Sequence, residues 1–199
     1  MEAAYGMVQG QQNSSGDWTY PIRVASVDAD IQDCLDDGII LVGAAGNGSH
    51  KIDVPGGADY DNYFVDTVFG NSYYHRGSTP SSQPGVICVG NISYVYEGGL
   101  EPLFNSSEKG PRLDISAPGG GIQSCIPAGT GSGTSYPLDP AFEIGKKSGT
   151  SMASPQVAGV LATIMEMRPT YTPADCLAWL QEVGETGRLY DPTTGTPGT

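Results

Sequence analysis

The sequence predicts an α/β fold in which a buried helix packs against a parallel sheet. Residues 39–46 (IILVGAAG) and 85–92 (GVICVGNI) are short, continuous apolar runs, as is typical of strands buried on both faces. A helical pattern directly precedes the first run, which is the order found in parallel α/β units. Residues 151–167 are apolar on nearly all sides and therefore predict a central, buried helix.

The first helix is expected over residues 26–38 (SVDADIQDCLDDG). Its apolar residues have helical spacing, its first turn is acidic, and its closing glycine stands where a C-terminal cap belongs. After the strand over 39–46, residues 48–85 are rich in Gly, Asp, Tyr and Ser and show no sustained period. They predict a long surface excursion, and loops of that length are usually functional or carry small elements of their own.

Further strands are expected after this excursion. The run at 85–92 is followed by RLDISAPG (112–119) and IQSCIP (122–127), both read as short strands. Residues 127–145 are predicted to be a loop.

Two helices are predicted to close the fold. The apolar helix over 151–167 is expected to end before Pro169, because the residue preceding a proline disfavours helical geometry. The last helix has Thr172 as N-cap, Pro173 at its first position and an acid in its first turn, and it is expected to stop near Gly184.

Length and charge limit the classes of protein. A chain of 199 residues is long enough for one domain with a core, and no linker divides it. We expect a single domain over 1–199, with an insertion at 49–85 and a turn-rich tail at 185–199. Twenty-two acids against nine bases give a net charge of −13, which argues against nucleic acid and anionic membranes as partners.

No membrane-spanning or secretory signal is expected. No apolar run approaches the roughly 20 residues of a membrane span, and the first residues lack the basic start and apolar stretch of a signal peptide. Localisation stays open, with a cytoplasmic and a virion-associated protein both compatible. The four cysteines are widely spread with no CxxC pair, so no zinc site is expected. Each of them (Cys34, Cys88, Cys125 and Cys176) stands among apolar neighbours, which predicts four buried free thiols.

The chemistry is expected around Ser151, at the N-terminus of the apolar helix. Unpaired backbone N–H groups and the helix dipole favour negative charge there, as an oxyanion formed in acyl transfer requires. Asn47 follows a buried strand at its carboxyl end and is a candidate second donor. Taken alone, Ser151 is better explained as a helix cap, and its combination with Asn47 favours the catalytic interpretation.

The motifs around these two residues resemble a known family. GTSMASPQVAGVLA (149–162) is similar to the serine motif of the subtilisin-like serine proteases, the subtilases, and VGAAGN (42–47) resembles their oxyanion-hole segment. The segments between the motifs follow in the family's order, and the likeness covers about residues 26–183. It implies a subtilisin-like fold, a polypeptide substrate, Ser151 as nucleophile and Asn47 as the side-chain oxyanion donor.

The resemblance also implies a substrate pocket. Ala44, Ala45 and Gly46 would form one wall of the pocket for the residue that precedes the scissile bond. Asp53, two residues before Pro55, matches the position that sets the pocket floor and would there select arginine or lysine. The alternative, which we favour, is that Asp53 opens the insertion and faces water.

The chain departs from the family pattern in one respect. Subtilases place their catalytic Asp and His before the oxyanion segment, and neither motif is present, so the sequence resembles the C-terminal half alone. His50 and His75 do not open a helix and are expected to be surface or loop histidines. No cofactor is predicted. The acids of residues 53–66 could bind calcium, but they lack the spacing of a known calcium loop, and a solvated acidic loop is the interpretation that we favour.

Three functions remain at this point. The first is a serine endopeptidase module whose Asp and His come from an upstream segment or another chain, which would cover the missing half. The second is an inactive structural or peptide-binding protein in a larger assembly such as a virus particle. The third is a hydrolase with a rewired base.

Overall fold

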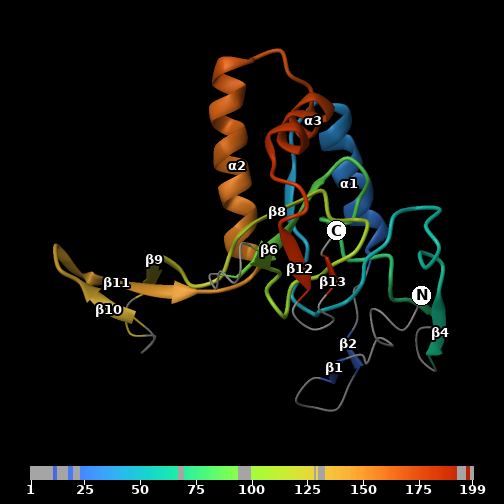
Figure 1. Ribbon diagram of the computed structural model, residues 1–199, viewed down its shortest axis with the longest axis horizontal. Coiled ribbons are helices and arrows are strands. Elements are labelled where there is room, and N and C mark those ends of the chain that lie inside the picture. Colours follow the sequence, from blue (N-terminus) through green and yellow to red (C-terminus); the bar gives the residue numbers. More distant parts are fainter. Residues whose placement is uncertain are drawn as a thin grey trace.

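The central sheet has the predicted parallel arrangement (Figure 1). This computed structural model describes residues 11–12, 18–19, 23–66, 70–93, 100–127, 129, 133–191 and 196–197. The sheet consists of β3 (Val42–Ala44), β6 (Ile87–Ile92) and β8 (Ile115–Pro118), in the order β3–β6–β8. Both strand pairs are parallel. The apolar runs that predicted buried strands therefore form the centre of the fold.

Helix α2 (Thr150–Met167) packs one face against this sheet. Its buried residues include Ala153, Val157 and Leu161, which share a core cluster with side chains of β6. The prediction of a central, buried helix holds for one face of α2 only, because Val160 is 46% exposed and Met167 is 70% exposed. Within the described part of the chain, packing reaches only one stripe of this apolar helix.

The two other helices match their predicted positions. Helix α1 (Ala25–Asp36) precedes β3. Helix α3 (Pro173–Val183) begins with a capping box, in which the Thr172 hydroxyl accepts a hydrogen bond from the Asp175 N–H at 3.2 Å and the Thr172 N–H donates to the Asp175 carboxylate at 2.9 Å. No described helix is long and apolar enough to cross a membrane.

The insertion carries an element of its own, as its length indicated. Strands β4 (Tyr63–Asp66) and β5 (Gly70–Tyr73) form an antiparallel hairpin. The insertion is nevertheless not confined to the surface, because Ile52 is fully buried. The remaining short strands pair in two small sheets: β1 (Gln11–Gln12) with β2 (Trp18–Thr19), and β7 (Glu101–Pro102) with β12 (Leu189–Asp191) and β13 (Thr196–Pro197).

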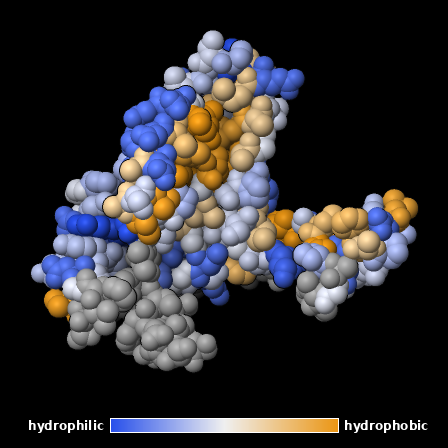
Figure 2. All heavy atoms as spheres, turned by 180° about the vertical axis from the view of Figure 1, so that it is seen from behind, coloured by the Kyte–Doolittle hydropathy of each residue, from blue (hydrophilic) through white to orange (hydrophobic). Residues whose placement is uncertain are grey.

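An antiparallel arm projects away from the helices (Figure 1). It consists of β9 (Ile122–Pro127), β10 (Gly133–Tyr136) and β11 (Asp139–Lys147), in the order β10–β11–β9. The prediction of a loop over 127–145 is therefore wrong. Leu138 is 83% exposed and Phe142 is 52% exposed, and Figure 2 shows apolar side chains on the arm and, separately, on the body.

The cysteines differ from one another in exposure. Cys88 and Cys176 are buried, as predicted, whereas Cys34 is half-buried and Cys125 is exposed on the arm, which contradicts the prediction for these two. Burial raises the pKa of the Cys88 thiol to about 12. Cys88 is therefore a packing residue without nucleophilic character.

Candidate active site

Ser151 is the second residue of α2, and its side chain is exposed. The N–H groups of a helix's first turn have no partner inside the helix. Among the described residues, the Ser151 hydroxyl has no hydrogen-bond partner. The structure thus presents this hydroxyl to solvent at the positive end of the helix, where an anion is favoured.

Asn47 lies at the same helix end. Its Oδ1 accepts hydrogen bonds from the Thr150 N–H at 3.0 Å and from the Thr150 hydroxyl at 3.3 Å. The Gly46 N–H donates to the Thr150 hydroxyl at 3.2 Å. Thr150 is fully buried and joins the turn after β3 to the start of α2. Asn47 itself is exposed, and its Nδ2 has no partner among the described residues.

Gly149 completes the contact between Asn47 and the helix. Its φ of 149° lies in the region that favours glycine. A Cβ at this position would lie 3.3 Å from Asn47 Oδ1 and 3.4 Å from Nδ2. A larger residue would therefore strain the backbone and press on the carboxamide. Sequence reasoning singled out Ser151 but assigned no role to Thr150 or Gly149, although both belong to the quoted serine motif.

Two hydrogen-bond donors consequently stand at one helix end beside an exposed hydroxyl. They are the Ser151 backbone N–H and Asn47 Nδ2. Fixed donors stabilise negative charge that develops on a carbonyl oxygen during acyl transfer. This arrangement suits an acyl-transfer nucleophile.

The residues before Asn47 run from the end of β3 into the turn. Ala44 is half-buried, and Ala45 is 2% exposed with its N–H bonded to the Val89 carbonyl at 3.0 Å. Gly46 has φ of 117°, and a Cβ there would lie 2.8 Å from Glu108 Cγ. Contacts to neighbouring segments therefore hold the backbone of Ala44, Ala45 and Gly46 in place directly before Asn47, and we call this segment the backbone edge.

Asp53 does not face water, which corrects the interpretation favoured from sequence. It is 3% exposed, and its Oδ1 and Oδ2 accept hydrogen bonds from the Val54 N–H at 2.8 Å and the Asp59 N–H at 3.0 Å. A buried carboxylate needs such donors to offset its desolvation. Asp53 thus closes a turn inside the insertion.

Both histidines lie outside helices and strands, as predicted, but neither is exposed on the surface. His50 is 7% exposed and its Nδ1 lies 3.0 Å from Glu108 Oε1, whereas His75 is 8% exposed and its Nδ1 lies 2.7 Å from the Lys51 carbonyl oxygen. Neither ring is hydrogen-bonded to Ser151 within the described part of the chain. Sequence reasoning did not single out Glu108, because no local pattern marks it.

Two other acids of the insertion, Asp59 and Asp61, are also paired. Lys51 bonds Asp59, and this hydrogen bond is the main reason why the pKa of Asp59 lies below its ordinary value. Arg76 lies 2.7 Å from Asp61. Across the described residues, no group of three His, Cys, Asp or Glu side chains is placed to hold a metal ion.

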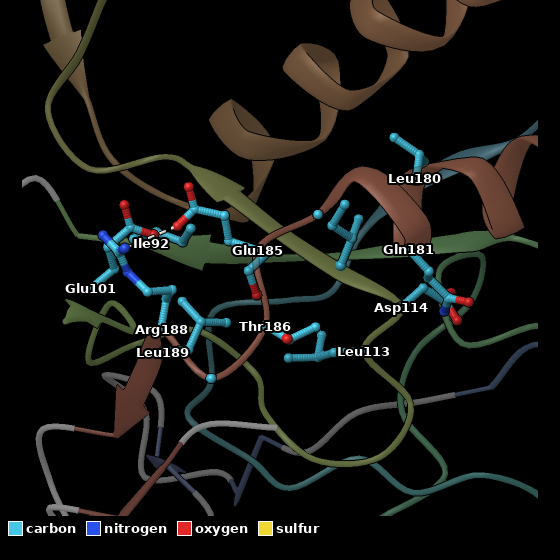
Figure 3. A pocket seen from close by; sticks show the side chains of 14 residues that line it. Ile92, Glu101, Leu113, Asp114, Leu180, Gln181, Glu185, Thr186, Arg188 and Leu189 are labelled. Atoms are coloured by element: carbon cyan, nitrogen blue, oxygen red, sulfur yellow. Dashed lines mark ion pairs between the residues drawn. The ribbon is translucent and has the colours of Figure 1, made fainter. Parts of the chain in front are cut away.

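A separate pocket of about 510 Å³ lies between the end of α3 and β12 (Figure 3). Leu113 and Leu180 contribute apolar walls, and an Arg188–Glu185 ion pair of 3.2 Å lies at its edge. The lining includes neither Ser151 nor Asn47. This pocket is therefore distinct from the candidate site.

The chain is similar in sequence to known proteins of one family. A family model described as the subtilase family matches residues 5–186. The subtilisin of Bacillus pumilus is 37% identical over 95 residues, which are 48% of this chain and 28% of that protein. Subtilisin-like protease 1 of Trichophyton rubrum is 34% identical over 135 residues, which are 67% of this chain and 23% of that protein.

Solved structures show the same fold. A cold adapted subtilisin-like serine proteinase matches with a TM-score of 0.59 at 20% identity, over 92% of this chain and 55% of that one. A protease from Pseudoalteromonas arctica matches with a TM-score of 0.61 at 23% identity, over 98% of this chain and 53% of that one. The chain thus spans less than a third of the two curated relatives above and about half of these two structures.

Proposed function

The chain belongs to the subtilase family, and on that premise we propose that it carries the nucleophile and the oxyanion hole of a serine endopeptidase site. Ser151 is the nucleophile, and the Asn47 side chain and the Ser151 N–H are the oxyanion donors. The observation that carries this proposal is the Asn47–Thr150 hydrogen bond, which holds the asparagine beside the serine.

In the proposed reaction, Ser151 Oγ attacks the carbonyl carbon of a peptide bond, and the carbonyl oxygen becomes the oxyanion. A base must remove the hydroxyl proton, because a serine at its ordinary pKa is a weak nucleophile. We assign that base, with its carboxylate partner, to an Asp/His-bearing segment that is either upstream of this chain or on another polypeptide. The same segment would cover the exposed side of α2.

Substrate binding is proposed along the backbone edge of Ala44, Ala45 and Gly46. Their position next to Asn47 fits the wall of the pocket for the residue before the scissile bond. Asp53 is left out of this pocket, because both of its carboxylate oxygens already accept N–H groups of its own turn.

A second candidate function is an inactive subtilase-like module with a structural or peptide-binding role in a larger assembly, such as a virus particle. The observation that fits it is that, among the described residues, no base is hydrogen-bonded to the Ser151 hydroxyl. The exposed apolar residues of the arm and of α2 fit either function, because both need a covering protein.

A fluorophosphonate serine-hydrolase probe distinguishes the two functions. The 199-residue chain alone should be labelled slowly or not at all. Co-expression with the segment encoded immediately upstream should restore labelling, and Ser151→Ala should abolish it. Absence of labelling in the co-expressed complex would favour the inactive module. Rapid labelling of the chain alone, lost in His50→Ala or His75→Ala, would instead support a rewired base.

A further inference from the structure

The turn that presents Asn47 rests on a buried pair of polar side chains. Glu108 Oε1 accepts a hydrogen bond from the Gly48 N–H at 3.2 Å and lies 3.0 Å from His50 Nδ1. The side chains of His50 and Glu108 are only 7% and 5% exposed. Glu108 Oε1 therefore contacts both Gly48, which directly follows Asn47, and His50.

The backbone of the same turn is fixed by the segment that carries Glu108. The Glu108 N–H donates to the Gly46 carbonyl at 3.1 Å, and the Lys109 N–H donates to the His50 carbonyl at 3.0 Å. The Ser49 N–H donates to a carbonyl of the same segment at 3.0 Å. Asn47 is thus held on both sides along the chain by contacts to one neighbouring segment.

Both glycines that flank Asn47 pack directly on this pair. A Cβ on Gly46 would lie 2.8 Å from Glu108 Cγ, and a Cβ on Gly48 would lie 2.3 Å from the His50 ring. Contacts below 3.0 Å leave no room for a methyl group, since interiors are close-packed. The carboxamide of Asn47 is hydrogen-bonded to Thr150. A change at Glu108 would therefore move the turn that places Asn47.

The pair lies buried at an energetic cost. His50 Nε2 and Glu108 Oε2 are buried and have no hydrogen-bond partner among the described residues. Such orphaned polar atoms are rare in proteins because their desolvation is not repaid. An apolar pair would avoid this cost, but it could not accept the Gly48 N–H. The need for that acceptor is a reason for a polar group at this place.

We propose that Glu108, supported by His50, is a positioning residue for the oxyanion donor Asn47. It acts through the Gly46–Asn47–Gly48 turn and does not touch the substrate. The kinetic part of this proposal rests on the proposed function, whereas the structural part does not.

The structural part is tested by NMR on the full 199-residue chain with ¹⁵N-labelled asparagine and glycine. Asn47→Asp identifies the Asn47 side-chain signal by its loss. Glu108→Ala should shift that signal and speed hydrogen exchange at the Gly48 amide about fivefold to tenfold, the effect of one lost hydrogen bond. Glu108→Gln keeps a carbonyl acceptor and should restore both readouts.

Asp114→Ala is the matched control. Asp114 Oδ2 accepts the Cys88 N–H at 2.8 Å, so this variant also removes a carboxylate that holds a backbone N–H, but outside the turn. It should lower the melting temperature and leave the Asn47 signal in place. If Glu108→Ala fails to fold, His50→Ala should shift the same signal. An Asn47 signal that is unchanged in the folded variant tested would overturn the proposal.

The kinetic part uses the chain co-expressed with the upstream segment. Glu108→Ala should lower kcat by up to about 10²-fold at nearly constant KM, because an oxyanion donor is worth about 10²–10³. The double variant with Asn47→Ala should be no slower than Asn47→Ala alone, since Glu108 acts through Asn47. Additive losses would overturn the proposal. A shifted Asn47 signal together with an inactive wild-type complex would reject the proposed function and support the positioning role.

Discussion

Two substitutions at Asn47 separate the acceptor and the donor functions of its carboxamide. Oδ1 accepts two hydrogen bonds from Thr150, whereas Nδ2 is the atom proposed to bind the oxyanion. Asn47→Ala removes both functions. Asn47→Asp keeps the acceptor but replaces the donor by a carboxylate oxygen, so the two variants should differ in stability and agree in inactivity.

The stability effect follows from the burial of Thr150. This residue is fully buried, so Asn47→Ala leaves its N–H and its hydroxyl without their acceptor, at a cost of about 2 kcal/mol. For a chain of 199 residues, this lowers the melting temperature by about 4–8 °C. Asn47→Asp should stay within about 1 kcal/mol of the wild type, because a negative charge is favourable at a helix N-terminus.

The activity effect is measured as peptide hydrolysis by the chain co-expressed with its upstream segment. Loss of the asparagine donor cost about 10²–10³ in kcat in subtilisin, where it was measured directly. Asn47→Ala should lose a comparable factor and Asn47→Asp at least as much, because its charge repels the oxyanion. Retained activity in Asn47→Asp would refute the oxyanion assignment, and an unchanged melting temperature in Asn47→Ala would refute the capping argument.

Three further predictions concern other parts of the chain. Ser151→Ala should abolish fluorophosphonate labelling. It should change the free energy of unfolding by less than about 0.5 kcal/mol, because the side chain is exposed and has no hydrogen-bond partner among the described residues. A larger loss of stability would contradict this placement. At pH 8, iodoacetamide should modify Cys125 quickly and Cys88 only after denaturation, since burial raises the Cys88 pKa to about 12; equal rates would contradict its burial. The hydrogen bonds from Thr172 lower the pKa of Asp175 below its ordinary value of 3.8. The ionised Asp175 carboxylate therefore contributes to the free energy of unfolding above pH 3.8, and this contribution is lost as pH falls through the lowered pKa. Asp175→Asn should make the free energy of unfolding fall less steeply at acid pH than in the wild type. An unchanged dependence on pH would contradict this.

Local signals explain which elements the sequence could predict. Helix α3 was placed correctly because Thr172 and Pro173 mark a helix start through their own backbone chemistry. Strand β9 of the arm was predicted from the run IQSCIP, whereas β10 and β11 were missed. Phe142 and Ile144 alternate with polar or small residues in β11, but the glycines and prolines of this segment resembled those of a loop. Strand β11 pairs with both β10 and β9, and this pairing, which the local sequence does not display, defines β10 and β11 as strands.

The buried polar residues could not be predicted from local patterns. His50 and Glu108 are 58 residues apart, and nothing near either one indicates the other. Asp53 was expected in water because aspartate is seldom buried unless paired. Its partners turned out to be N–H groups of its own turn, which a sequence does not display.

The choice of asparagine at position 47 bears on the two candidate functions. As a structural cap for α2, the residue needs only an acceptor for the Thr150 N–H, and aspartate would supply one and add a favourable charge at the helix N-terminus. The chain uses acids freely, with 22 of them, so a general avoidance of carboxylates does not explain the asparagine. What asparagine alone provides is a donor on the exposed side of the same group. An oxyanion site needs that donor, whereas an inactive module does not, and the Asn47→Asp variant tests this difference directly.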